Sequence, residues 1–163
     1  MKIKSQKGFS IIELMVVATI IGLLAVMTFS YLGGARGQAK DAKRFNDLDQ
    51  LGKLLSFVCP VPNAGIGEYD LGQVIAELKI KYPQYADSVP DNIYDPKTGN
   101  PTVTNYKYIV DADSNCVIYA NLEEGNEDAT LNFNSPKPGG GKGIFEAATP
   151  GWNGTAKYFQ ISN

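Results

Sequence analysis

The stretch Lys7–Leu32, which reads K-G-F-S-I-I-E-L-M-V-V-A-T-I-I-G-L-L-A-V-M-T-F-S-Y-L, decides the fold of this chain. No side chain from Leu14 to Leu32 is charged. At about 1.5 Å per residue, a helix of this length crosses a hydrocarbon core of roughly 30 Å. The residues before it, 1–7, are basic and contain no acid. Because basic flanks stay on the cytoplasmic side, we expect a single membrane span with its N-terminus in the cytoplasm.

One carboxylate interrupts the apolar stretch. Glu13 lies one turn inside it, where an unpaired charge costs on the order of a few kcal/mol. Two explanations remain open: the side chain reaches back to the lipid headgroups, or it awaits a cation. Cleavage of the Gly8–Phe9 bond would supply that cation, because it leaves a free α-amine on Phe9. Glu13 could then pair with the Phe9 amine of a neighbouring chain.

The segment Lys7–Leu14 resembles the class III signal sequence of type IV pilins and type II secretion pseudopilins. That pattern is a short basic leader, a Gly, a first mature Phe, and a Glu four residues after the Phe. Gly8, Phe9 and Glu13 match it. The resemblance implies cleavage after Gly8 by a prepilin peptidase, N-methylation of Phe9, and stacking of the N-terminal helices in a filament core.

The chain departs from the family pattern at one position. Many members have a proline where this chain has Ser30, and Gly33 and Gly34 follow closely. Glycine lowers helix propensity by about 1 kcal/mol relative to alanine. The glycines therefore either bend or locally melt the helix, or merely loosen its exit from the membrane.

The resemblance also implies a domain order and a set of partners. Residues 1–8 are a leader removed by prepilin peptidase, 9–34 the transmembrane and filament-core helix, and 35–163 the globular head. The partners are copies of this chain and other pilins, the prepilin peptidase/N-methyltransferase, an inner-membrane assembly platform, and membrane lipid before assembly. The protein would first be a single-pass protein of the cytoplasmic (inner) membrane, and then part of a cell-surface or periplasmic filament.

Composition excludes several classes of function. The chain has 163 residues, a net charge of −2 and no His. Charge therefore does not indicate nucleic-acid binding, and histidine metal ligands or a histidine general base are impossible. We expect no enzyme activity, no catalytic residues and no cofactor or metal. The alternative is that acidic loop residues bind calcium. The candidate ligands are Asp111, Asp113, Glu123, Glu124, Glu127 and Asp128.

The chain has two cysteines, Cys59 and Cys116. Because the bulk of the chain is expected to be exported, we predict a disulfide between them. The alternative is two buried free thiols that behave as small apolar residues.

The residues after the membrane stretch continue the helix. Apolar residues recur every three or four positions, which indicates one buried helix face: Ala39, Ala42, Phe45, Leu48, Leu51, Leu55 and Val58. The opposite, solvent-facing side is predicted to carry Lys40, Arg44, Asp47 and Lys53. The helix should run from Ser10 to Val58, because Cys59-Pro60 stops it.

The remaining chain predicts a small sheet. A short helix should follow an Asp70 cap and end before Pro83. The turn Asp95–Pro101, D-P-K-T-G-N-P, resembles the segment that leads into the sheet of many pilins and pseudopilins. Strands are predicted at Asn105–Val110 and Cys116–Leu122, which form a hairpin, and at Thr130–Phe133 and Lys157–Ile161, with a flexible loop at Asn134–Gly143. The fold class is α+β and pilin-like: a long N-terminal helix packed against a small antiparallel sheet.

The function expected from the sequence is structural. The chain would polymerise through its N-terminal helix into a type IV pilus or a pseudopilus, with Glu13 carrying assembly and Ile11, Leu14, Val17, Ile21 and Leu24 packing helix against helix. The alternatives are a minor tip subunit with adhesive or DNA-uptake function, and a monomeric membrane-anchored binding module that uses Trp152 and the tyrosines.

Overall fold

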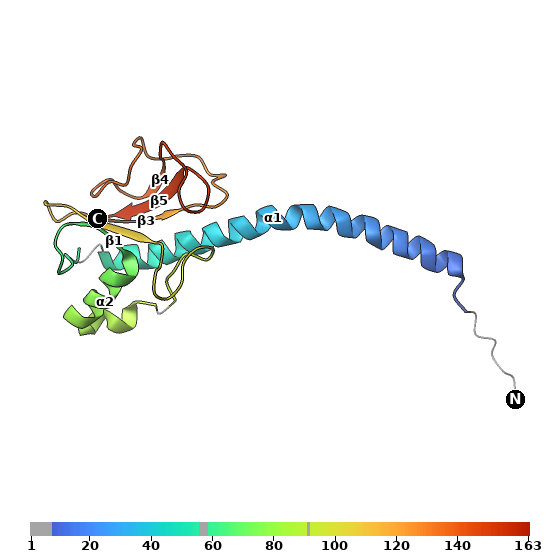
Figure 1. The fold of residues 1–163 in the computed structure, drawn as a ribbon, viewed down its shortest axis with the longest axis horizontal. Coiled ribbons are helices and arrows are strands. Elements are labelled where there is room, and N and C mark those ends of the chain that lie inside the picture. Colours follow the sequence, from blue (N-terminus) through green and yellow to red (C-terminus); the bar gives the residue numbers. More distant parts are fainter. Residues whose placement is uncertain (1–7, 56–58, 91) are drawn as a thin grey trace, which may run out of the picture. The chain divides into compact units, whose positions relative to one another are not determined.

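The computed structural model describes residues 8–55, 59–90 and 92–163, without the side chains of residues 30–32 and 55. Its elements are α1 (Ile11–Leu55), β1 (Gly67–Asp70), α2 (Leu71–Lys81), the 3-10 helix η1 (Pro83–Ser88), β2 (Lys107–Val110), β3 (Cys116–Asn121), β4 (Gly143–Glu146) and β5 (Lys157–Ser162) (Figure 1). The chain divides into two units, Met1–Arg36 and Gly37–Asn163. We call the second unit the head.

The head is built on one antiparallel sheet with the strand order β1-β2-β3-β5-β4. The predicted hairpin is present as β2 and β3, with Val110 opposite Cys116. The Asp111 side chain accepts hydrogen bonds from the backbone N–H groups of Asp113 and Asn115, which closes the turn between the two strands. β5 comes from the C-terminal end of the chain and pairs with β3, so the sheet is complete only when both ends of the head have come together.

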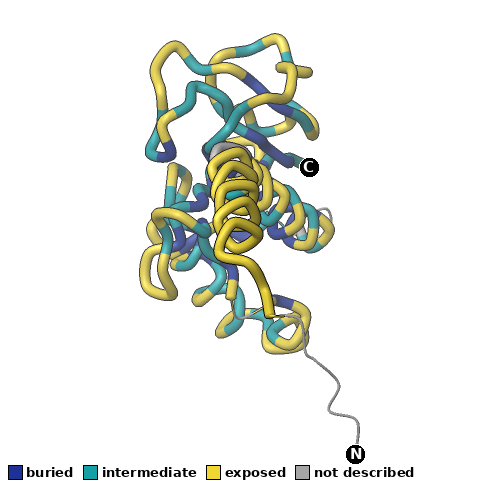
Figure 2. The backbone as a smooth tube through the Cα atoms, turned by 90° about the vertical axis from the view of Figure 1, so that its right-hand side faces the viewer, coloured by how far each residue is buried: buried dark blue, intermediate teal, exposed yellow. Residues whose placement is uncertain are grey.

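The core lies between one face of this sheet, the head portion of α1, and α2. Leu48 and Leu51 of α1 pack with Leu71 and Val74 of α2 and with the inward-facing strand residues; the dark-blue segments of Figure 2 mark buried residues in the head. α1 approaches β5 closely, because a Cβ placed on Gly52 would lie 2.7 Å from the Cγ2 atom of Ile161. The fold is thus α+β and pilin-like, as the sequence predicts.

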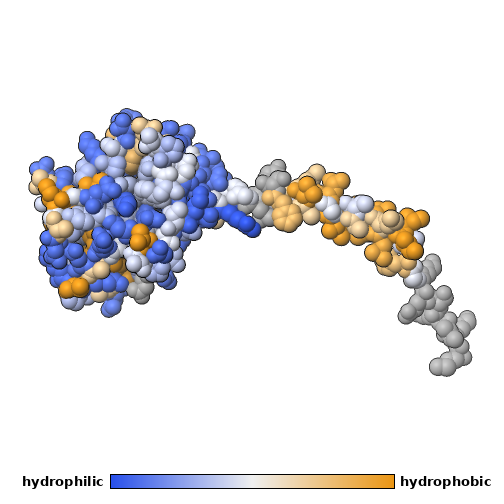
Figure 3. All heavy atoms as spheres, viewed as in Figure 1, coloured by the Kyte–Doolittle hydropathy of each residue, from blue (hydrophilic) through white to orange (hydrophobic). Residues whose placement is uncertain are grey.

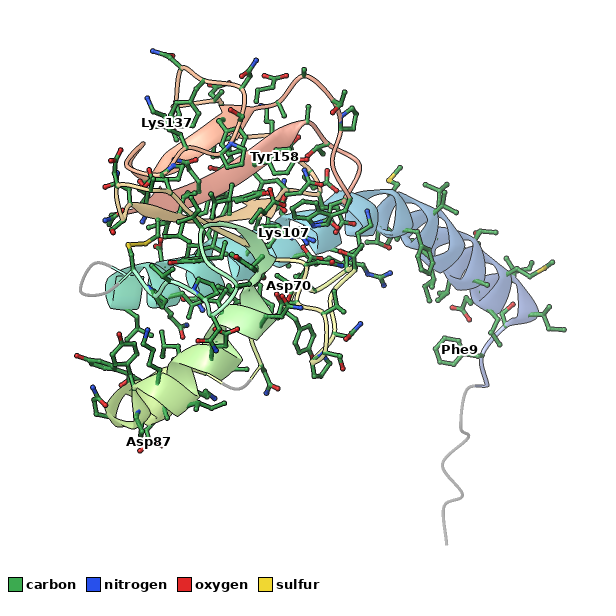
Figure 4. All side chains as sticks on the ribbon, turned by 60° about the vertical axis from the view of Figure 1, so that its left-hand side comes forward. Phe9, Asp70, Asp87, Lys107, Lys137 and Tyr158 are labelled. Atoms are coloured by element: carbon green, nitrogen blue, oxygen red, sulfur yellow. A yellow bond between two sulfur atoms is a disulfide. The ribbon has the colours of Figure 1, made fainter. Side chains whose placement is uncertain are left out.

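Loops cover the other face of the sheet. Tyr158 stacks on Phe145 with ring centroids 5.3 Å apart, and Phe133 and Trp152 pack against them from the loops. The buried Gln160 side chain bonds the N–H and C=O groups of Lys137, a residue that Figure 4 labels on the covering loop. Both faces of the central strand β3 are therefore buried.

A buried ion pair joins α1 to the turn that starts at Asp95. Arg44 and Asp95 are both fully buried, and the guanidinium donates to the carboxylate through Nε at 2.7 Å and Nη2 at 3.0 Å. The backbone N–H groups of Lys97 and Thr98 and the Asn153 amide also donate to Asp95. We call Arg44, Asp95 and Asn153 the hub, because α1, the turn and the C-terminal loop meet there.

Charge in the hub is well compensated. Burial by itself would raise the pKa of Asp95, but the hydrogen bonds from Arg44, Thr98, Lys97 and Asn153 lower that pKa from 3.8 to about 2. Burial would lower the pKa of Arg44, yet its bonds to Asp95 and Asp41 raise it. Both groups are therefore ionised at neutral pH.

Two further acids of α1 face the head. Asp41 accepts from Arg44 and from the backbone N–H groups of Glu123 and Glu124. Asp47 accepts from the hydroxyl of Tyr106 at 2.9 Å. The prediction that Arg44 and Asp47 face solvent is therefore wrong: 0% and 8% of their surfaces are exposed, because polar groups of the head pair with both.

Several other boundaries differ from the sequence prediction. Residues 130–133 form no strand; the N–H groups of Thr130 and Leu131 instead both donate to the carbonyl of Ile144 in β4. β1 and β4 were not expected at all. α1 runs through Gly33 and Gly34 without interruption, so the helix does not melt there. The leader residues 1–7 and the predicted helix end at Val58 lie outside the described residues.

The two cysteines form a disulfide, with Cα atoms 5.6 Å apart and a sequence separation of 57. It links the segment that follows α1 to the start of β3. Cys116 is fully buried in the core cluster, so the bond lies inside the head.

Replacing both cysteines, Cys59→Ala with Cys116→Ala, should lower the free energy of unfolding of the head by about 2–4 kcal/mol, because the unfolded chain regains the entropy of an open loop. Denaturant titration of the detergent-solubilised chain measures the change. The reduced wild-type chain is the control and should unfold near the same midpoint. A double variant as stable as the oxidised wild type would contradict the prediction.

Asp95→Asn should lower the free energy of unfolding by about 3–5 kcal/mol at neutral pH, because it leaves Arg44 buried without its main counter-charge. The folded-state pKa of Asp95 lies below its ordinary value, so its ionised form stabilises the head fully above about pH 5 and loses that contribution as pH falls toward about 2. The difference in the free energy of unfolding between wild type and variant should therefore narrow by about 2 kcal/mol between about pH 5 and about pH 2.

Denaturation curves at several pH values test this prediction. Asp113→Asn, a change at an exposed turn position, is the matched control and should leave stability nearly unchanged. A gap that stays constant down to about pH 2 would show that the charge of Asp95 contributes nothing.

Candidate processing and assembly site

The Gly8–Phe9 bond lies just before α1, which begins at Ile11. Neither residue belongs to a helix or strand. Phe9 is 82% exposed, and Figure 4 shows its ring beside the first turn of α1. A Cβ on Gly8 would meet no atom within 4 Å. Exposed backbone outside regular structure is where peptidases cut, so the geometry leaves this bond accessible.

Glu13 occupies the third helical position of α1, and its carboxylate accepts a hydrogen bond from the backbone N–H of Ser10 at 2.9 Å. Ser10 in turn accepts the first helical bond, from the N–H of Leu14. This contact is half of a capping box, in which a Glu reaches back to the cap residue. A negative charge in the first turn also interacts favourably with the helix dipole and so stabilises the helix. Glu13 therefore has a role within its own chain.

The sequence prediction did not assign this cap. The signal was present as Ser10-Ile11-Ile12-Glu13, the S-x-x-E spacing of a capping box. The cap does not exclude pairing with a neighbouring chain, because a carboxylate has two oxygens and about four acceptor sites.

The rest of the N-terminal unit exposes apolar side chains around the whole helix. The residues expected to pack in a filament are between 49% and 79% exposed: Ile11, Leu14, Val17, Ile21 and Leu24. Figure 3 shows the same hydrophobic character along the visible face of this unit. A helix that is apolar all round belongs in a membrane or inside a protein assembly.

Within the described residues, one helix is long and apolar enough to cross a membrane, namely α1. Its most apolar window has a mean hydropathy of 2.5. The hydroxyls of Thr19 and Thr28 donate to backbone carbonyls of the preceding turn. This bonding satisfies them without water, as apolar surroundings require.

The acidic residues Glu123 and Glu124, proposed above as calcium ligands, instead make contacts within the head. Glu123 lies 3.1 Å from Lys40 and 3.4 Å from Lys97, and the backbone N–H groups of Glu123 and Glu124 bind Asp41. In the described part of the chain, no three potential metal-ligating side chains come together.

Comparison with known proteins identifies the N-terminal segment. Residues 3–29 match the family model described as the prokaryotic N-terminal methylation motif. No curated protein and no solved structure matches the chain. The matched range contains Gly8, Phe9 and Glu13 together with most of the exposed apolar surface of α1. The chain therefore carries a class III signal peptide of the kind characteristic of type IV pilins and pseudopilins, joined to an α+β head of pilin-like fold.

Proposed function

We propose that this protein is a structural, non-enzymatic subunit of a type IV pilus or of a type II secretion pseudopilus. The observation that carries the proposal is the methylation motif at residues 3–29, whose part from Ile11 onward lies on a helix with apolar side chains exposed on all sides. Such a surface needs lipid before assembly and neighbouring helices after it.

The proposed roles follow the chain. Gly8 is the last residue of the leader, and a prepilin peptidase/N-methyltransferase cuts after it and methylates Phe9. The new amine of Phe9 and the carboxylate of Glu13 are opposite charges four residues apart in the same unit. In a staggered stack of helices, Glu13 of one subunit pairs with the Phe9 amine of the next.

This charge pair gives the filament a free-energy advantage over the bilayer that apolar packing alone does not give. Lipid tails are as apolar as leucine, so moving the α1 surface from the bilayer into a filament core gives little hydrophobic gain. An unpaired carboxylate is unfavourable in the bilayer, whereas a paired one in the filament is compensated. The Glu13 carboxylate is therefore more stable beside a neighbouring subunit than in lipid, and we propose that this difference drives assembly.

The subunit is proposed to enter the inner membrane with its N-terminus in the cytoplasm and to leave it through an assembly platform. Copies of this chain and other pilins are its partners in a cell-surface or periplasmic filament.

Mass spectrometry of the chain from its native membrane or sheared-filament fraction tests the proposal. The expected result is an N-terminus at Phe9 with one added methyl group, together with two missing hydrogens for the Cys59–Cys116 bond. A chain that still starts at Met1, in cells with an active prepilin peptidase, would overturn the proposal in favour of a monomeric membrane-anchored binding module.

Glu13→Gln and Glu13→Ala separate charge pairing from helix capping. Gln can keep the capping contact with Ser10 but has no charge, whereas Ala loses both. If the charge pair drives assembly, both variants should still be cleaved after Gly8. Their filament yield should fall at least about tenfold, because the loss of one such pair costs more than about 1.4 kcal/mol at this depth. Filament yield by shearing and cleavage by mass spectrometry are the readouts. A Gln variant that assembles like wild type while the Ala variant fails would assign Glu13 to capping alone.

A further inference from the structure

The far end of α2 presents an apolar patch with a positive charge. Ile80 is 82% exposed, Val61 40% and Tyr85 36%. Val61, Ile80 and Tyr82 line one pocket of about 350 Å³, and Tyr82 and Tyr85 have ring centroids 6.4 Å apart. Glu77 also lines this pocket, but its carboxylate accepts a hydrogen bond from the backbone N–H of Asn63. The ammonium of Lys81 lies 5.7 Å from the ring of Tyr82. We call Val61, Ile80, Lys81, Tyr82 and Tyr85 the α2 patch. Ile80 is more exposed than the patch's Val61 and Tyr85.

A second surface of the head has the complementary chemistry. Ala42, Phe45 and Leu122 form the apolar floor of an open pocket of about 220 Å³, and Glu124 and Glu127 stand at its rim. A cavity of roughly 150 Å³ already holds a benzene molecule, so an isoleucine side chain fits. We call these five residues the acidic pocket.

The floor of the acidic pocket is rigid. Leu122 is 1% exposed, and Phe45 packs edge-to-face on Phe159 with ring centroids 4.7 Å apart. Lys157 donates to the backbone carbonyl of Glu127, and Lys40 and Lys97 both lie against Glu123. Neither Glu124 nor Glu127 forms a salt bridge within the described chain, so their charges are available to a partner.

The two surfaces lie at opposite ends of the head portion of α1. The acidic pocket uses the helix turns from Gln38 to Phe45. The α2 patch adjoins Pro60–Asn63, which follow the end of α1; Figure 1 shows α2 beside that end of the helix. The helix between them extends about 20 Å. One copy therefore cannot close the contact on itself.

We propose that the α2 patch of one subunit docks into the acidic pocket of a second copy of this chain, with Ile80 entering the pocket and Lys81 meeting Glu124 and Glu127. Two different surfaces on one subunit make a heterologous contact, and such contacts generate open filaments when the rotation does not close. This inference rests on the proposed filament function and specifies how the heads associate. Charge complementarity and the apolar fit of Ile80 argue for a second copy as the occupant.

Charge exchange in the full chain, expressed in cells that assemble the filament, tests the contact. Lys81→Glu and Glu127→Lys should each lower the yield of sheared filaments about fivefold, because each places like charges against each other at a partly desolvated contact. The double variant should recover most of the yield. Lys137→Glu and Asp113→Lys, at exposed positions in neither surface, are the matched controls and should assemble normally.

A photo-crosslinking residue in place of Ile80 gives an independent readout. Irradiated filaments should contain crosslinked dimers whose peptides map to the 38–45 or 122–127 segments of another copy. Crosslinks to a different region of this chain, or to another protein, would overturn the proposal.

The outcomes separate this contact from the filament itself. If the charge variants assemble like wild type while Glu13→Ala does not, the head contact is wrong and the filament function stands. If the processed wild-type chain yields no filaments in the presence of its assembly machinery, the filament function fails, and the head contact fails with it.

Discussion

The ion pair between Arg44 and Asp95 is the constraint on which the head depends. Both groups are fully buried, and removing two charges from water costs several kcal/mol per ion. The structure offsets that cost only because the Asp95 carboxylate also receives the N–H groups of Lys97 and Thr98 and the amide of Asn153. Any other rotation of α1 would leave one of these charges buried and unpaired. The pair thus fixes which side of the helix faces the sheet.

This constraint explains where prediction from the sequence failed. The helix itself was predictable, because its apolar residues recur at helical spacing. The buried side was predicted only in part: Phe45, Leu48 and Leu51 pack in or against the core, whereas Ala39 and Ala42, which the same apolar spacing selects, are exposed. The charged residues Asp41, Arg44 and Asp47 are also buried on the side of α1 that faces the head. A hydropathy scale that treats each residue alone places charged side chains in solvent. The sequence around Arg44 does not show that its guanidinium pairs with Asp95, which lies 51 positions further along the chain.

The three central strands and the processing motif were easier to predict than the two edge strands. β2, β3 and β5 have β-branched or aromatic runs, and Phe159 and Ile161 face the core as their alternation indicates. β1 and β4 have four residues each and contain glycine, so pairing with a neighbour defines them rather than propensity. At the N-terminus, Gly8, Phe9, Glu13 and the apolar run had to coincide, which made that segment recognisable.

The position of Asn153 in the hub has a consequence for biogenesis. Asn153 lies 58 residues after Asp95, and its amide bonds both Asp95 and the carbonyl of Asn121. The hub therefore stays incomplete until the segment that carries Asn153 has joined Arg44 and Asp95. A chain interrupted before Asn153 would still contain α1 and the motif at residues 3–29, but its Asp95 carboxylate would lack one donor. Such a chain would present an unfinished head to proteases, so folding of the head also checks that this late segment is present.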